Sequence, residues 1–399
     1  MKHLATRARQ ALGGGGLPPR GVTLVELLVV ITIMLILLAV MVPRLRPMME
    51  QRRMREAART VSVFFGAARS RALETGRPVG VAIERLKIQP DAAVTLRMVE
   101  EPPLYAGDVI GARVRVRRLG ATNRFQVLFA SPADVAAMLT QVVPVHVGDL
   151  VRFEYQAVPY RVLGLDMDLD GNPDGDSDDI VGDPGFAVGS NPVVILVELD
   201  PAEGVVPAWP AATPNAPWPP QGNGVGSRRL AFQITRRPEP TAAAPVRLPG
   251  RTVIDLTASG TDSMALNPPP PGFVPVDKDA GTAGVQDPSP VIVMFNPDGR
   301  VSSVYYQDTP SAVTEVLYFL VGRWERMPAE SGGPPLAEDG LYNPQDITNF
   351  WIVINPNTGL VLTAPLVGDT VDATTGVKTP STLVAARAEA RNMRGIGGR

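Results

Sequence analysis

The chain has 399 residues, with 38 Lys and Arg against 40 Asp and Glu, so its formal net charge is −2. This length permits two or three domains, each with a hydrophobic core. The sequence has no cysteine and only two histidines, which excludes disulfides, thiolate-bound zinc, iron–sulfur clusters, a cysteine nucleophile and a multi-histidine metal site. Proline and glycine together make up about a fifth of the chain, below the share typical of wholly disordered sequences.

Residues 22–42 form an apolar stretch, VTLVELLVVITIMLILLAVMV, with a single charge at Glu26. As a helix it spans roughly 30 Å, the thickness of the hydrocarbon core of a bilayer. The sequence therefore predicts a transmembrane helix at 22–42. Thr23 and Glu26 have the spacing of a capping box, in which both side chains satisfy backbone N–H groups of the first turn. A second interpretation is that Glu26 pairs with a cation from another subunit.

The residues at the start of this helix resemble the prepilin cleavage and methylation signature of type IV pilins and type II secretion pseudopilins. A basic leader at 1–21 ends in Gly21, and Val22, Thr23 and Glu26 follow it. The resemblance implies that a prepilin peptidase cuts after Gly21 and that Val22, where the family usually has phenylalanine, is then N-methylated. It also implies that Glu26 neutralises the N-terminal amine of a neighbouring subunit during filament assembly.

The same resemblance predicts the location of the chain. In that family the leader is cytoplasmic, the apolar helix crosses the inner membrane once, and everything after residue 42 is periplasmic or extracellular. The expected partners are prepilin peptidase, other pilin or pseudopilin subunits, the inner membrane and secreted cargo.

Residues 43–77 predict an amphipathic stalk helix, since apolar residues recur at steps of three and four. We expect this stripe to pack on a sheet of the same protein. Gly76 and Pro78 end the predicted helix, and Pro43 is expected to kink or locally melt it. The stripe consists of Met54, Ala58, Val61, Phe65, Ala68 and Ala72.

Residues 78–379 predict an antiparallel, β-rich head, so the expected fold class is α+β. Residues 71–83, a passage from helix to strand, resemble GspH/FimT-type minor pseudopilins, as do 291–301 and 351–365. Each of the last two has apolar runs on both sides of a turn sequence, Asn-Pro-Asp-Gly or Asn-Pro-Asn-Thr-Gly, which favours a β-hairpin. Residues 246–256 fit a further strand of that family.

A large insertion, approximately 91–245, separates the parts that resemble this family. It is also expected to be β-rich, because short runs of β-branched residues recur along it. Residues 133–140 favour one short helix, and the seven prolines of 201–222 predict an extended linker. The strand-like runs are 93–99, 112–119, 125–130, 150–155, 160–165 and 193–199.

An aspartate-rich segment, 166–183, holds eight aspartates in 18 residues and no basic residue. Carboxylates that alternate along a loop, with Gly171 at the sharp turn, are the hard oxygen ligands that Ca²⁺ prefers. We therefore expect a structural Ca²⁺ site, with a solvated acidic turn as the alternative. The expected ligands are Asp166, Asp168, Asp170, Asp174, Asp176, Asp178 and Asp179.

We expect no enzymatic activity, because opposed catalytic acids and nucleotide-binding glycine patterns are not discernible and His146 is expected to be structural, on a strand. The expected function is that of a minor pseudopilin or pilin-like subunit. Two alternatives stay open. One is a DNA-binding minor pilin for DNA uptake, which would use the arginines of a basic, flexible tail at 380–399, although nucleic acid is the less favoured partner. The other is a membrane-anchored head that binds cargo or has enzymatic activity.

Overall fold

The computed structural model describes fifteen segments of the chain. It describes the backbone alone at residues 39–48, 165, 194, 211–212, 370–371 and 378–379. The chain divides into two units, residues 1–52 and 53–399, which are described separately below. The described segments are 23–107, 110–129, 145–154, 158–165, 194–199, 211–212, 229–262, 272–275, 289–307, 309–328, 334–337, 339–368, 370–371, 378–379 and 382–392.

Helix α1 runs from Leu24 to Thr75. Its backbone remains helical at Pro43, where the sequence predicts a kink or local melting. The helix ends where predicted: Gly76 has a φ of +64°, which favours glycine, and its N–H donates to the Ala72 carbonyl at 3.1 Å.

In the part of the chain that the structure describes, no helix is both long and apolar enough to cross a membrane, so the span predicted at 22–42 is not shown. Val22 and the side chains of 39–42, which belong to that predicted span, lie outside the described residues.

In the second unit, the C-terminal half of α1 packs on the main β-sheet through the predicted stripe. All six stripe residues are at most 1% exposed, and Ala57 is buried beside them. They share one core with apolar residues from the sheet, and the ring of Phe65 stacks on that of Phe319 with centroids 5.6 Å apart. The prediction that this stripe packs on the protein's own sheet is confirmed.

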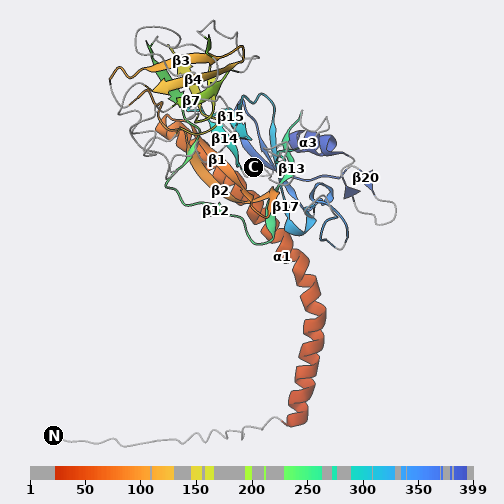
Figure 1. The fold of residues 1–399 in the computed structure, drawn as a ribbon. Coiled ribbons are helices and arrows are strands. Elements are labelled where there is room, and N and C mark those ends of the chain that lie inside the picture. Colours follow the sequence, from red (N-terminus) through yellow and green to blue (C-terminus); the bar gives the residue numbers. More distant parts are fainter. Residues whose placement is uncertain are drawn as a thin grey trace, which may run out of the picture. The chain divides into compact units, whose positions relative to one another are not determined.

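The main sheet has eleven strands, and its neighbouring strands are antiparallel. Figure 1 labels its strands β1, β2, β12, β13, β14, β15 and β17. Its central path is β16-β15-β14-β1-β2-β13-β17-β18-β19, and β11 and β12 also pair with β2. The bounds are β1 Val79–Leu86, β2 Gln89–Glu100, β11 Glu239–Pro240, β12 Val246–Arg247, β13 Thr252–Thr261, β14 Val291–Phe295, β15 Val301–Tyr306, β16 Thr309–Ser311, β17 Leu317–Arg323, β18 Phe350–Ile354 and β19 Val361–Pro365.

Both predicted hairpins are confirmed, as β14–β15 and β18–β19. Their turns lie against each other and against α1. The Val301 N–H donates to the Pro356 carbonyl at 2.9 Å, and Arg69 of α1 donates to the Gly299 carbonyl at 3.0 Å. Gly359 has a φ of +63°, and a β-carbon there would overlap the Gly299 oxygen. The two turns therefore fix the end of the stalk helix to the head.

Described strands of the predicted insertion, between residues 114 and 235, form a second, eight-stranded sheet with its own core. The run 93–99 is an exception, because it belongs to β2 and pairs with β1 in the main sheet. The other runs are confirmed as strands of the second sheet, whereas 133–140 lies outside the described residues. The bounds are β3 Val114–Leu119, β4 Arg124–Phe129, β5 Leu150–Phe153, β6 Tyr160–Leu165, β7 Val194–Glu198, β8 Ala211–Ala212, β9 Arg229–Leu230 and β10 Phe232–Thr235.

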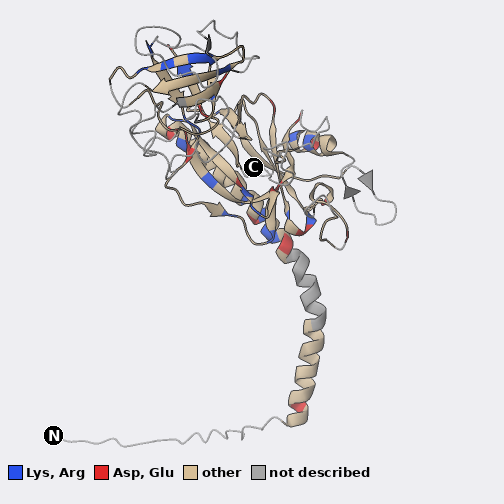
Figure 2. Ribbon diagram, viewed as in Figure 1, with Lys and Arg blue, Asp and Glu red and all other residues tan. Residues whose placement is uncertain are grey.

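Inward and outward residues alternate along β3, the strand where Figure 2 shows basic residues. Val114 and Val116 belong to the core of the second sheet, whereas Arg115 and Arg117 lie on the opposite face. Both arginines are nonetheless nearly buried, at 6% and 1% exposed. Arg117 donates to Gln126 at 2.5 Å, so these two arginines are covered and do not form an open basic surface.

A second helix, α3 (Leu383–Asn392), packs on the face of the main sheet opposite α1. Alternation along β17 shows the two faces, since Phe319 lies in the core under α1 whereas Tyr318 lies in the core under α3. The sequence predicts a basic, flexible tail at 380–399 with a frayed helix from Ser381, and ten of these residues form a helix that packs on the sheet. The remaining short elements are β20 Thr370–Val371, β21 Lys378–Thr379, η2 Trp324–Arg326 and η4 Asn343–Gln345.

Candidate processing and assembly site

Thr23 caps the N-terminus of α1. Its hydroxyl accepts a hydrogen bond from the Glu26 N–H at 3.2 Å, and its carbonyl accepts the first helical bond from Leu27 at 3.0 Å. The threonine half of the predicted capping box is therefore present. In the described part of the chain, the Glu26 carboxylate does not return a bond to the Thr23 backbone.

Glu26 lies in the first turn of α1, exposed, and within the described residues its carboxylate makes no hydrogen bond or ion pair. The positive end of the helix dipole favours a negative charge at this position. Glu26 is also the only charged residue among 23–38, so it stands alone at the edge of an apolar surface. A carboxylate in this setting can pair with an incoming cation without first breaking another contact.

Apart from Glu26 and Thr32, residues 24–38 of α1 are apolar on every side, and nothing covers them in the part of their unit that the structure describes. The large apolar side chains from Leu24 to Leu38 are each between 48% and 79% exposed. A helix that is apolar all round is stable only when it is buried in lipid or among other helices. Water-exposed apolar surface of this extent marks a site of association.

The remaining predicted processing residues and the predicted Ca²⁺ ligands are not tested by the geometry. Gly21 and Val22 precede the described residues. The seven predicted Ca²⁺ ligands, and the whole aspartate-rich segment 166–183, also lie outside the described residues. Among the residues that are described, no group of three or more acidic or histidine side chains is placed to hold a metal ion.

His146 lies in a turn before β5, not on a strand as predicted. The Asp149 carboxylate accepts two backbone N–H bonds, from His146 and from Arg237, each at 2.8 Å. Burial raises the pKa of Asp149. The pKa of His146 is lowered, first by burial and then by the nearby positive charge of Arg237. Because the carboxylate holds backbone groups and not the imidazole, this pair stabilises a loop and does not form a catalytic dyad.

Asp255 on β13 is a fully buried acid that the sequence did not reveal. It accepts from the Thr257 hydroxyl at 2.5 Å, from the Thr257 N–H at 3.0 Å and from the Asn343 amide at 3.1 Å. Burial raises its pKa, although these hydrogen bonds oppose the shift. The strand register slips directly after this residue, so the carboxylate replaces missing strand hydrogen bonds.

Arg387 of α3 is completely buried and is part of the fold. It donates to the carbonyls of Ala258 and Thr261, each at 2.5 Å, and its guanidinium lies 5.6 Å from the ring centre of Tyr318. Burial lowers the pKa of Arg387 to about 10. Arg391 pairs with Asp262 at 3.2 Å. Nothing in the sequence around Arg387 indicates that this side chain is buried.

Residues 19–42 match a family model described as the prokaryotic N-terminal methylation motif, a type IV pilin-type signal. The matched segment contains the predicted cleavage and methylation positions, Gly21 and Val22, and it includes Thr23 and Glu26 at the start of α1. No curated protein and no solved structure matches the chain significantly. The motif suggests a pilin-like substrate of prepilin peptidase that is exported or anchored in a membrane and assembles with other pilin subunits.

Proposed function

We propose that the protein is a minor pseudopilin or pilin-like subunit of a type II secretion or type IV pilus-like filament. Prepilin peptidase removes the leader after Gly21, and Val22 is methylated. Residues 22–42 hold the chain in the inner membrane until assembly, with the N-terminus cytoplasmic and the head outside. The observation that carries this proposal is a methylation motif whose acid, Glu26, has no partner among the described residues and lies at the start of the exposed apolar segment 24–38 of α1.

The proposed mechanism of assembly is charge neutralisation in an apolar environment. An unpaired carboxylate inside a membrane or a helix bundle is costly, and a cation within about 4 Å removes much of that cost. The new N-terminal amine of a neighbouring chain supplies such a cation when its helix is in register. Glu26 therefore selects one axial position of the neighbour, while the apolar side chains of α1 contribute most of the contact area.

The head has a structural role in this proposal, with no enzymatic activity. The end of α1 packs on an antiparallel sheet, and both hairpins that resemble GspH/FimT-type minor pseudopilins are present. This arrangement supports a head fixed to its assembly helix, with the second sheet as an added surface for cargo or partners.

DNA uptake is the less favoured alternative. It depends on free arginines in the C-terminal tail, but Arg387 is buried against backbone carbonyls and Arg391 pairs with Asp262. Arg387 is therefore not available as a phosphate contact, whereas Arg391 is half-exposed in a surface ion pair, and Arg394 and Arg399 lie outside the described residues.

Replacing Glu26 by glutamine tests the assembly role. Removing one partner of a buried ion pair costs about 3 kcal/mol, or about a hundredfold in the equilibrium for adding a subunit. We expect normal cleavage and membrane retention, but near-complete loss of the variant from sheared filaments, measured by immunoblot of both fractions. Glu74→Gln, an exposed glutamate near the end of the same helix, is the matched control and should assemble normally. Assembly of Glu26→Gln at the wild-type level would contradict the proposal.

Calcium binding by the aspartate-rich segment 166–183 stays a prediction from the sequence. Titration of the metal-free protein with CaCl₂ is expected to raise its melting temperature with the logarithm of the calcium concentration above the dissociation constant. At a hundredfold excess over that constant the added stability is about 2.7 kcal/mol. The same titration of a variant with Asp168, Asp170 and Asp174 replaced by asparagine should give no such rise. An equal response of both proteins, or no response of either, would leave the segment a solvated acidic turn.

A further inference from the structure

An exposed basic surface lies at one end of the second unit. It consists of Arg53, Arg55 and Arg59, from the stretch of α1 where packing on the main sheet begins, and of Lys87 in the turn between β1 and β2. All four residues are exposed, and within the described part of the chain none of their side chains makes a hydrogen bond or an ion pair. We call these four residues the basic rim.

The fold brings Lys87 towards the arginines of the helix. β1 runs back along α1, because alternate residues of this strand lie in the same core as the helix stripe. The strand starts beside the end of the helix, where Glu100, the strand partner of Val79, pairs with Arg71 at 2.6 Å. Lys87 lies about 26 Å further along the strand direction, and the same length back along the helix reaches residues 55–59.

Neighbouring acids balance the charge of the basic rim only in part. Arg55 and Arg59 are four residues apart on one face of the helix, where like charges repel. Glu56 is the acid between them in the sequence, and Glu84 of β1 is already bound to Arg97 at 2.5 Å. The helix therefore has a positive face that an anionic partner would stabilise.

Two observations favour a lipid headgroup as that partner. Ile88, next to Lys87 in the turn, is 68% exposed, and an apolar side chain beside a cation suits the boundary between headgroups and acyl chains. The basic rim also follows the apolar segment closely, since the helix from Val42 to Arg53 rises by about 16 Å. A headgroup layer is about 5–7 Å thick, and charges act over about 8–10 Å beyond it. Arg53 is therefore within electrostatic reach of the headgroups.

The distribution of charge along the chain indicates that these arginines have a function of their own. Residues 43–59 contain six arginines and two glutamates, against four basic residues in the leader 1–21. Basic residues near a membrane helix normally lie on its cytoplasmic side, but the proposed orientation places 43–59 on the opposite side. The arginines therefore do not act as an orientation signal, and contact with anionic lipid explains their presence there.

We propose that the basic rim binds the headgroups of anionic phospholipids on the outer face of the inner membrane and holds the head against that membrane before assembly. This inference rests on the proposed function, because the apolar segment of α1 has to anchor the chain. Entry into a filament then has to break the headgroup contacts, since the head leaves the membrane surface together with its helix. The basic rim is thus a second, reversible attachment beside the apolar one.

The test uses the full-length protein in vesicles of phosphatidylcholine, with or without a minor share of phosphatidylglycerol. The chain has no cysteine, so Gly250→Cys gives one site for a fluorophore, at an exposed position where a β-carbon meets no atom within 4 Å. This position lies between β12 and β13, which both pair with the part of β2 nearest Lys87. A nitroxide on the headgroups quenches the fluorophore when the head lies on the membrane. We expect phosphatidylglycerol to increase quenching and high salt to reverse it.

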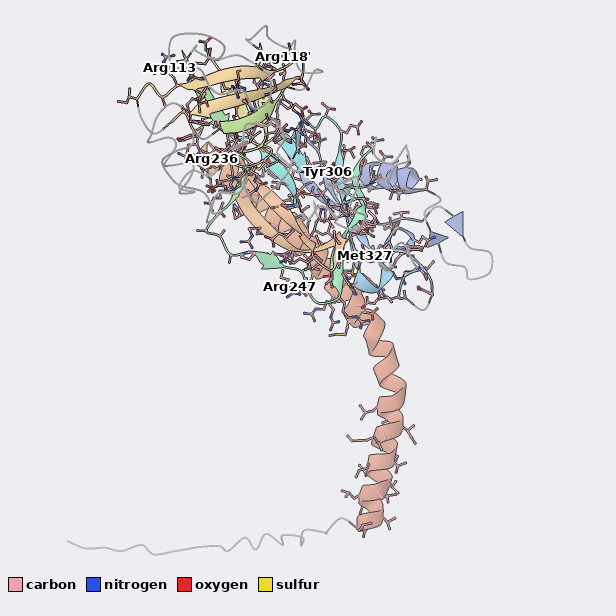
Figure 3. All side chains as sticks on the ribbon, viewed as in Figure 1. Arg113, Arg118, Arg236, Arg247, Tyr306 and Met327 are labelled. Atoms are coloured by element: carbon pink, nitrogen blue, oxygen red, sulfur yellow. The ribbon has the colours of Figure 1, made fainter. Side chains whose placement is uncertain are left out.

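Matched variants assign the effect to the basic rim. Each cation at an anionic membrane surface strengthens binding about fivefold, so Arg55→Gln with Arg59→Gln should lower the ratio of membrane-bound to free heads by about 25-fold. The control is Arg77→Gln with Arg113→Gln, which changes two exposed arginines that make no ion pair within the described residues. Figure 3 labels Arg113 beside the strands of the second sheet. The control should be quenched like the wild type, and equal melting curves by circular dichroism verify that both variants fold.

Flotation separates this inference from the proposed function. If the protein does not float with neutral vesicles, the apolar segment is not an anchor, and the proposed anchoring and the role of the basic rim are both wrong. If it floats, but phosphatidylglycerol does not increase quenching or the two double variants respond alike, only the role of the basic rim is overturned. Loss of quenching when duplex DNA is added at an equal phosphate concentration would assign the surface to nucleic acid and would also overturn it.

Discussion

Gly21→Ala is expected to leave the protein as an uncleaved, membrane-retained precursor. The added methyl group stands next to the bond that is cut, and a site that accommodates glycine holds the backbone too closely to accept it. One extra methylene in a substrate changes the kcat/KM of an enzyme by about 10- to 200-fold. A loss of this size is enough to block processing during cell growth. Pulse-chase labelling with mass spectrometry of the N-terminal peptide measures the outcome.

The leader provides a matched control for this variant. Gly16→Ala makes the same chemical change in the same basic segment, five residues before the cut, and should be processed at the wild-type rate. Mature chains beginning at Val22 in the Gly21→Ala strain would be incompatible with cleavage after Gly21 and, with it, with the pilin-like assignment.

Phe65→Ala is expected to destabilise the head by about 3–5 kcal/mol, and to lower its melting temperature by about 10 °C. The ring is completely buried and stacks on Phe319 in the core that joins α1 to the main sheet. Its removal takes away a large apolar contact and leaves a cavity that the rigid sheet cannot fill. Urea unfolding monitored by circular dichroism gives the free-energy difference.

Phe64→Ala is the control for position on the helix, because the neighbouring ring is only partly buried against the same core. Its cost should be about 1 kcal/mol. Equal losses in the free energy of unfolding for the two variants would contradict the view that α1 packs through one specific face.

Short-range patterns in the sequence predicted the buried face of the stalk helix and both hairpins. The 3.6-residue spacing of the stripe from Met54 to Ala72 predicted which face of α1 is buried, since helix geometry places those positions on one side. Turn residues predicted both hairpins, because Asn, Pro and Gly restrict backbone conformation within a few residues.

Such patterns did not predict which of the two sheets a strand joins. The run at 93–99 has the same composition as the strands of the insertion, yet it pairs with β1 in the main sheet. The insertion therefore begins after β2 and not at about residue 91. Nothing within a strand of six or seven residues specifies its partner, because pairing depends on which distant strand presents a matching face.

The sequence by itself determined the methylation motif, the position of Glu26 at the start of an apolar helix and the face by which the stalk packs. Each depends on residues that are neighbours along the chain or along one helix. Only the tertiary structure decided that Arg387 is buried and that Asp255 stabilises an irregular strand. These features bring together residues that are up to 129 positions apart, and no local pattern encodes such contacts.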